Sequence, residues 1–309
     1  MSEDHKQQLE SHSGTSSTSC KFGFAWAIWE TQNNLYCILR AFTRYGRRLK
    51  PDFQLEGVRW RLGDGPVLAT AIHAGHRLHP AMADYLRLPE TDRLREEDPF
   101  TGEWTAIGSH GTMVEWSRFN VDLNRPRERA VYAGPEEAWG LELYEGALPN
   151  NVREAALKFY DAFYLEVGRF VDWQLEQYRH LLILDLHSYN HRRNGPETNP
   201  AAPETNPVIN LGTAHLTFAG QWKTVLDSLE SVLRTEGLQT RRDVKFKGGN
   251  FSQWLNGRWP GRVCAVAVEV KKVFMDEWTG QRDEAEFRRI GAALEMAARA
   301  AEDAMLSLN

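Results

Sequence analysis

The sequence predicts an α/β fold in which a largely parallel sheet is flanked by helices. Four short apolar runs alternate along the chain with longer segments whose apolar residues recur at helical spacing. Three of these runs are almost continuously apolar, which is typical of strands covered on both faces by helices. Strands that alternate with helices in this way indicate one α/β sheet.

The predicted strands are short and rich in Val, Ile, Leu and Ala. They are residues 66–72 (PVLATAI), 112–121 (TMVEWSRFNV), 181–186 (LLILDL) and 263–270 (VCAVAVEV). The second differs from the others because polar residues interrupt its apolar pattern. We therefore expect the other three to form the buried centre of the sheet.

The predicted helices are long and amphipathic. They span residues 151–178, 221–236 and 284–306. In the first, Asn151 precedes Glu154 by three positions, which is the capping-box pattern of a helix start. Gly237 directly follows the second helix, as expected of a residue that ends a helix in a left-handed conformation.

Composition indicates a globular chain with a large core. Of the 309 residues 42% are hydrophobic and 11 are Trp, so we expect a single catalytic domain over residues 21–309. Residues 1–20 are rich in Ser, Thr and charge and predict a disordered tail. The formal net charge of −5 lacks the basic excess that binding to nucleic acid requires.

The cysteines and the chain start suggest a cytoplasmic protein. Cys20, Cys37 and Cys264 are odd in number and contain no Cys-x-x-Cys pair, which favours a reducing compartment over a disulfide framework. We expect no signal peptide and no membrane span, because no apolar stretch is long enough. Residues 196–207 (PETNPAAPETNP) contain four prolines and predict a surface loop that could cover a site.

Histidines follow the first predicted strand. The segment HAGHRLHP contains His73, His76 and His79, and Gly75 permits a tight turn between the first two. A His-x-x-His pair on such a turn can converge on one cation. A solvated loop is the alternative interpretation of three histidines so close together.

The third and fourth strands also end in residues that can carry chemistry. His187 follows the run LLILDL, and Glu269 lies near the end of VCAVAVEV. Catalytic groups of α/β proteins gather at the carboxyl ends of strands. The structural alternatives are a buried His187 satisfied by Asp185 and a Glu269 paired with Lys271 or Lys272, since an unpaired buried carboxylate is costly.

A fourth polar segment is RFNVDLNRPRE, residues 118–128. Asp122, Asn124 and Arg125 lie at the end of a predicted strand, and Arg offers a planar fork suited to a carboxylate. A structural ion pair between Asp122 and Arg125 is the alternative. Four strand ends that carry His, Arg, His and Glu together favour a functional site over four separate structural roles.

These motifs, in this order, resemble the N-formylglutamate amidohydrolase family and, more distantly, the zinc carboxypeptidases. The matching segments are IHAG (72–75), SRFNVDLNRP (117–126), LDLHSYN (184–190), INLGT (209–213), KGGNFSQWL (247–255) and VEVKKVFMDEWTG (268–280). The resemblance spans about residues 60–285. It implies a phosphorylase/hydrolase-like α/β fold and a metal-dependent amide hydrolase.

The resemblance also implies one zinc ion per chain, held by His73, His187 and a third ligand. Carboxypeptidases place a glutamate three residues after the first histidine, where this sequence has His76. By spacing, His76 is the expected ligand. A carboxylate from Glu97 or Asp98 is the alternative.

With zinc in place, the expected mechanism is hydrolysis of a small amide that carries a carboxylate, such as N-formylglutamate. Zinc with one open coordination position lowers the pKa of its bound water to about 7. Glu269 would act as general base, Arg118 would help to hold the developing oxyanion, and Asn124 with Arg125 would bind the substrate carboxylate.

Three other functions fit parts of the same pattern. A carboxypeptidase-like or other small-amide hydrolase would use the same residues on a different substrate. A non-catalytic carboxylate-binding protein on the same fold is suggested by His76 at the position of the expected glutamate. A serine hydrolase built on Ser188 is weaker, because no Gly-x-Ser-x-Gly elbow surrounds this serine. The oligomeric state does not follow from the sequence.

Overall fold

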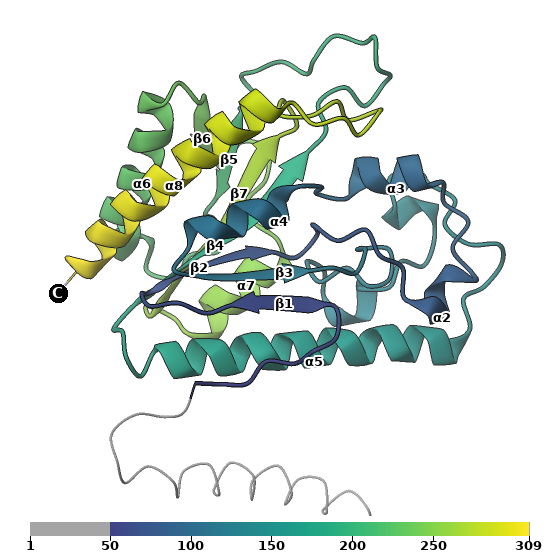
Figure 1. Cartoon of the computed structure of the whole chain (residues 1–309), viewed down its shortest axis with the longest axis horizontal. Coiled ribbons are helices and arrows are strands. Elements are labelled where there is room, and N and C mark those ends of the chain that lie inside the picture. Colours follow the sequence, from purple (N-terminus) through teal and green to yellow (C-terminus); the bar gives the residue numbers. More distant parts are fainter. Residues whose placement is uncertain (1–49, 309) are drawn as a thin grey trace, which may run out of the picture. The chain divides into compact units, whose positions relative to one another are not determined.

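The computed structural model describes residues 50–308, which build a seven-stranded mixed sheet with helices on both faces (Figure 1). The predicted tail of residues 1–20, together with Cys20 and Cys37, lies outside the described residues. Cys264 is a buried free cysteine in the sheet. Within residues 50–308 no helix is both long enough and apolar enough to cross a membrane.

The sheet has the order β1-β3-β2-β4-β7-β5-β6. Its strands are β1 (Val58–Arg61), β2 (Val67–Ala71), β3 (His110–Val114), β4 (Leu181–Tyr189), β5 (Ile209–Gly212), β6 (Thr240–Arg242) and β7 (Val263–Lys271). The central strands β3, β2, β4 and β7 run parallel, whereas β1 pairs with β3 and β5 pairs with β7 in antiparallel fashion. The predicted α/β class with a largely parallel sheet is confirmed.

The helices differ greatly in length. They are α2 (Pro80–Ala83), α3 (Glu90–Glu96), α4 (Thr101–Trp104), α5 (Asn150–Gln174), α6 (Lys223–Thr235), α7 (Asn250–Arg258) and α8 (Glu284–Leu306). Short 3₁₀ turns occur at Thr105–Ile107, Arg127–Arg129, Pro135–Glu137 and Ala219–Trp222. The three predicted helices correspond to α5, α6 and α8, so these predictions are confirmed.

Two local predictions differ from the structure. The predicted strand at residues 112–121 ends at Val114, because the chain then turns and Asn120 donates its backbone N–H to the carbonyl of Ser117. The predicted capping box does not form: α5 begins at Asn150 after Pro149, and no side chain caps it. Pro149 occupies the N-cap position, and its side chain has no oxygen that could accept the first N–H groups of the helix.

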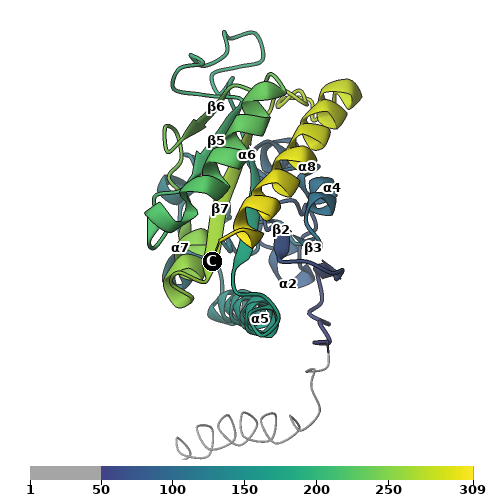
Figure 2. The same cartoon turned by 90° about the vertical axis from the view of Figure 1, so that its left-hand side faces the viewer.

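Helices cover both faces of the sheet (Figure 2), and each face has its own apolar core. In β4, Leu182, Leu184 and Leu186 pack with α6 and α8, whereas Leu181 and Ile183 pack with α5 and α7. Side chains alternate between faces along a strand, so the next residues on the second face are Asp185 and His187. The same alternation places Glu269 of β7 on the face of Val263 and Ala265.

Candidate active site

The carboxyl ends of β2, β4 and β7 bring three predicted residues to one edge of the sheet. His187 pairs in register with Glu269 across the parallel strands β4 and β7. On the other side of β4, Thr70 of β2 is in register with Asp185 and donates a hydrogen bond of 2.7 Å to its Oδ1. His73 follows the end of β2. The predicted gathering of polar groups at this edge is therefore present.

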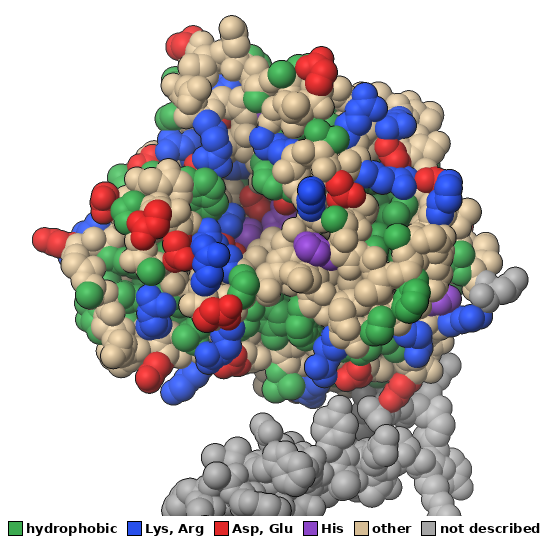
Figure 3. All heavy atoms as spheres, turned by 180° about the vertical axis from the view of Figure 1, so that it is seen from behind, with side chains coloured by type: hydrophobic (Ala, Val, Ile, Leu, Met, Phe, Trp, Pro, Cys, Tyr) green, Lys and Arg blue, Asp and Glu red, His purple; other side chains and the backbone are tan. Residues whose placement is uncertain are grey.

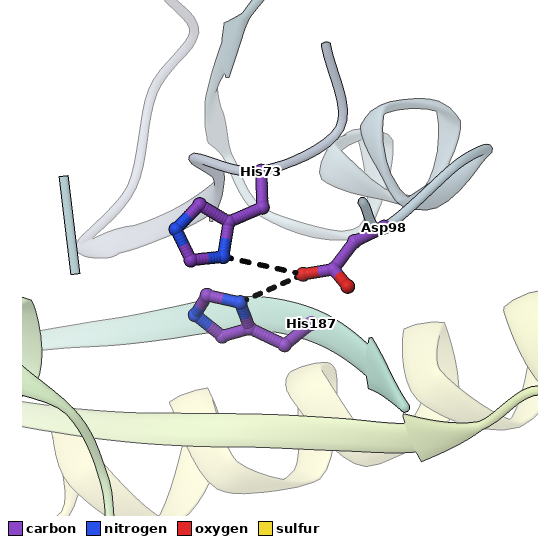
Figure 4. A group of neighbouring side chains, drawn as sticks. All are labelled: His73, Asp98 and His187. Carbon is purple, nitrogen blue, oxygen red and sulfur yellow. Dashed lines mark hydrogen bonds and ion pairs between the residues drawn. The ribbon is translucent and has the colours of Figure 1, made fainter. Parts of the chain in front are cut away.

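His73 and His187 converge on Asp98 (Figure 4). Oδ2 of Asp98 lies 2.9 Å from Nδ1 of His187 and 3.5 Å from Nδ1 of His73. All three side chains are buried, and the atoms that they offer as ligands lie within 4.8 Å of one another. Burial alone would raise the pKa of the Asp98 carboxyl, but the two histidines hold it well below its usual range.

The second nitrogen of each histidine faces a buried aspartate. Nε2 of His73 lies 2.8 Å from Oδ1 of Asp122, and Nε2 of His187 lies 2.9 Å from Oδ2 of Asp185. Carboxylates placed behind histidines in this way fix the ring orientation and tautomer of metal ligands. Both Nδ1 atoms thus face Asp98, and the three side chains form a donor set of two imidazoles and one carboxylate, which fits zinc.

Asp98 is held in place by main-chain contacts from two sides. Its backbone N–H donates to the carbonyl of His73 at 2.9 Å. Nζ of Lys272, just beyond β7, donates to the carbonyls of Arg95 and Glu97 at 2.5 and 2.8 Å. Burial lowers the pKa of Lys272 to about 8, and nearby acidic groups, Asp98 first among them, oppose that shift.

Glu269 of β7 carries a carboxyl whose pKa is raised. Burial raises the pKa of its carboxyl to about 7, and the positive charge of His187 partly opposes this rise. Among the described residues no side chain forms a hydrogen bond or salt bridge with Glu269, and the ammonium of Lys272 donates instead to the carbonyls of Arg95 and Glu97. The structural alternative of a lysine pair therefore does not account for this carboxylate.

The structure places His76 outside the cluster. Its Nδ1 contacts Glu97, and its Nε2 lies 3.1 Å from Glu90. Glu97 in turn accepts a hydrogen bond from Ser117. Of the alternatives raised by the sequence, Asp98 is the residue that joins His73 and His187, while His76 and Glu97 pair with each other.

Asp122 organises the arginine-bearing segment. Its Oδ2 accepts hydrogen bonds of 2.6 Å from both Arg118 and Tyr132, and it lies 3.4 Å from Nε of Arg125. Arg125 also donates to the carbonyl of Glu137, while its buried Nη1 has no hydrogen-bond partner among the described residues. Arg125 is not among the residues that line the cavity over the His73, Asp98 and His187 cluster, and its predicted contact with the substrate carboxylate stays a prediction.

A cavity of about 330 Å³ opens above these residues. Its lining contains His73, Asp98, His187 and Glu269, and it includes Arg118 and Asn124 but not Arg125. Oδ1 of Asn124 accepts the backbone N–H of Phe251, and Gly249 lies so close that a Cβ there would be 2.2 Å from this oxygen. Acidic and histidine side chains are visible inside a hollow in Figure 3, among lysines and arginines.

The sequence analysis did not identify several residues of the site. Arg193 and Lys245 line the cavity from loops, and Lys272 appeared only as a partner for Glu269. The one signal available was their position inside the family-like segments or next to them. Tertiary contacts between distant loops give these residues their places, and no local periodicity reports such contacts.

Comparison with known proteins shows the family of this chain. Residues 65–275 match the family model described as N-formylglutamate amidohydrolase. The chain belongs to the N-formylglutamate amidohydrolase family. The matched segment extends from the start of β2 to just past the end of β7, so it contains every residue of the site described above.

Individual members of the family and solved structures are similar to this chain. It is 30% identical over 213 residues to the N-formylglutamate deformylase of Pseudomonas putida. The matched region covers 63% of this chain and 72% of that protein. The crystal structure of an N-formylglutamate amidohydrolase from Ralstonia eutropha JMP134 has a TM-score of 0.65 at 17% identity and covers 80% of this chain and 98% of that one. A gene product of Agrobacterium tumefaciens has a TM-score of 0.58 at 17% identity, with 79% and 94% covered. The two structures share the fold.

Proposed function

We propose that this chain is a zinc-dependent amidohydrolase that cleaves the formamide bond of N-formylglutamate. The observation that carries this proposal is the convergence of His73, Asp98 and His187 beside the unpaired Glu269 on one cavity. The choice of substrate rests on the family and on the relative named N-formylglutamate deformylase.

His73, Asp98 and His187 would hold one zinc ion per chain. This set replaces the one that the sequence favoured, because Asp98 rather than His76 lies between the two histidines. When bound, zinc supplies Lewis-acid polarisation of a carbonyl and activation of water at neutral pH. Asp122 and Asp185 would hold the imidazoles in orientation from behind.

Glu269 would move the proton. Its carboxylate accepts a proton from the water that attacks the formyl carbon, and it returns this proton to the amine as the C–N bond breaks. The products are formate and the free amino acid. A pKa of about 7 lets the same group act as base and then as acid near neutral pH.

Arg118 and Asn124 would orient the substrate. Three nitrogens of Arg118 already donate to Tyr132, Asp122 and the carbonyl of Glu96, but the guanidinium has five N–H donors, so two remain for the developing oxyanion. The side-chain amide of Asn124 keeps its Oδ1 on Phe251, which leaves its Nδ2 to donate to the substrate carboxylate.

The test is release of formate from N-formylglutamate by purified protein, together with elemental analysis for zinc. We expect turnover, about one zinc per chain, and loss of both in Asp98→Ala and His187→Ala. His76→Ala is the matched control, and it should keep its zinc. Turnover that survives in a chelated protein free of metal would overturn the metal-dependent mechanism, and zinc lost from His76→Ala alone would overturn the ligand set.

A further inference from the structure

The cavity carries more positive charge than the proposed chemistry uses. Six lysines and arginines are among its lining residues, Arg95, Arg118, Arg193, Lys245, Lys247 and Lys272, against the three acidic residues Glu96, Asp98 and Glu269. A bound zinc ion would add to this excess. A substrate with a single carboxylate would leave part of the excess uncompensated, whereas a dicarboxylate would match it better.

Lys245 is a cation of this cavity that has no salt bridge among the described residues. It lies in the segment between β6 and α7, with Nζ 5.0 Å from the ring centre of Tyr189. Its ammonium donates a hydrogen bond to the neutral side chain of Asn206, and no acidic residue within residues 50–308 forms a salt bridge with it. Burial lowers the pKa of Lys245, and the neighbouring charge of Arg193 lowers it further.

Arg193 lies close to Lys245 although it belongs to a different loop, the one between β4 and β5. Its side chain is 49% exposed and lies 2.9 Å from Glu96, and it also faces the ring of Trp139. Glu96 accepts a further hydrogen bond from Asn190, whose buried Oδ1 has no partner among the described residues. This part of the cavity thus combines two adjacent cations with an unsatisfied polar group.

We propose that Lys245 and Arg193 form a second anion subsite that binds the side-chain carboxylate of N-formylglutamate, so that these two residues determine the preference of this chain for that substrate over its amide. This inference rests on the proposed amidohydrolase function. Two cations held close together repel each other, and an anion between them relieves that repulsion. The preference for a carboxylate side chain is then determined by two loops that carry none of the proposed zinc ligands.

The experiment compares N-formylglutamate with its isosteric amide, N-formylglutamine. In Lys245→Met, kcat/KM for N-formylglutamate should fall about 10- to 100-fold, the range expected for one charged hydrogen bond. The value for N-formylglutamine should stay unchanged, because that substrate has no side-chain charge to lose. Arg193→Met should shift the ratio in the same direction, and Lys245→Arg should restore most of it.

Arg241→Met is the matched control, because it removes one exposed positive charge from β6, four residues before Lys245, outside the cavity. Equal losses on both substrates in Lys245→Met, or an unchanged ratio, would overturn the subsite while leaving the amidohydrolase function intact. Wild-type protein that releases formate from neither substrate would instead overturn the proposed function. Binding of glutamate and glutamine, measured by calorimetry, gives the same comparison without turnover.

Discussion

At the scale of single residues, the arrangement depends on which nitrogen of each histidine is free. Asp122 contacts Nε2 of His73 and Asp185 contacts Nε2 of His187. The Nδ1 atoms of both histidines therefore face Asp98. Neither aspartate has exposed surface, so each would be costly to bury without such partners. The polar groups behind the cluster are therefore as much a part of the site as the three side chains in front.

The general-base assignment predicts the behaviour of Glu269→Gln. Glutamine keeps the size of the side chain but cannot accept a proton from water. Because general-base catalysis typically contributes about 10²- to 10⁴-fold, kcat should fall by that range while bound zinc and the melting temperature change little. Steady-state kinetics and elemental analysis of the same preparation measure both.

The alternative role for Glu269 predicts a different result. A carboxylate that only neutralised a buried lysine would leave that cation uncompensated when removed, which costs about 3–5 kcal/mol of unfolding free energy. A stable, zinc-loaded Glu269→Gln protein with wild-type turnover would refute the proton-transfer role.

At the scale of elements, hydrogen bonds join the carboxyl end of α3 and the residue that follows it to Lys272, just beyond β7. Lys272 donates to the carbonyl of Arg95, in the last turn of α3, and to that of Glu97, the residue just before Asp98. The lysine is almost fully buried, with 1% of its surface exposed. Its ammonium thus connects the end of the strand that carries Glu269 to the segment that carries Asp98, the proposed carboxylate ligand.

This connection predicts weaker zinc binding in Lys272→Met. Loss of groups that orient ligands typically costs about 10- to 100-fold in metal affinity, and competition with a chromogenic chelator measures the dissociation constant. Lys271→Met is the matched control, because this neighbouring lysine makes no such contact with residues 95–97. An unchanged zinc affinity in folded Lys272→Met would show that Asp98 is positioned without the lysine.

At the scale of the whole molecule, the sheet has an apolar core on each face, and the polar residues of the site lie together at one edge of it. The two cores extend along the strands, and the polar residues begin where β4 and β7 approach their carboxyl ends. The cores therefore supply the stability that allows buried aspartates and histidines to remain in a fixed arrangement.

Zinc should accordingly stabilise the folded chain. A ligand that binds only the folded state at a hundredfold excess over its Kd contributes about 2.7 kcal/mol, or a rise of about 5–10 °C in Tm for a domain of this size. Scanning calorimetry of chelated and zinc-loaded protein measures the shift. Asp98→Ala should abolish it, whereas Asp227→Ala, on the exposed face of α6, should leave it intact. An equal shift in Asp98→Ala would place the zinc elsewhere.

The sequence by itself determined the central strands, the three long helices and the residues at strand ends. Apolar runs and helical spacing are local patterns, and the segments of β2, β4 and β7 carry them clearly. Because a residue that follows a buried parallel strand must emerge at the carboxyl edge of the sheet, His73, His187 and Glu269 were predictable as neighbours. The short strands β1, β5 and β6 were missed because they have too few residues to show a period.

Only the tertiary structure decided which of several plausible side chains face the cavity. His76 follows His73 closely in sequence, yet it turns to Glu97, while Asp98 reaches the cluster through its bond to His73 and the anchor at Lys272. Arg125 is similarly drawn to Asp122 and the carbonyl of Glu137. Side chains on loops are oriented by contacts with distant segments, and such contacts leave no regular spacing in the chain.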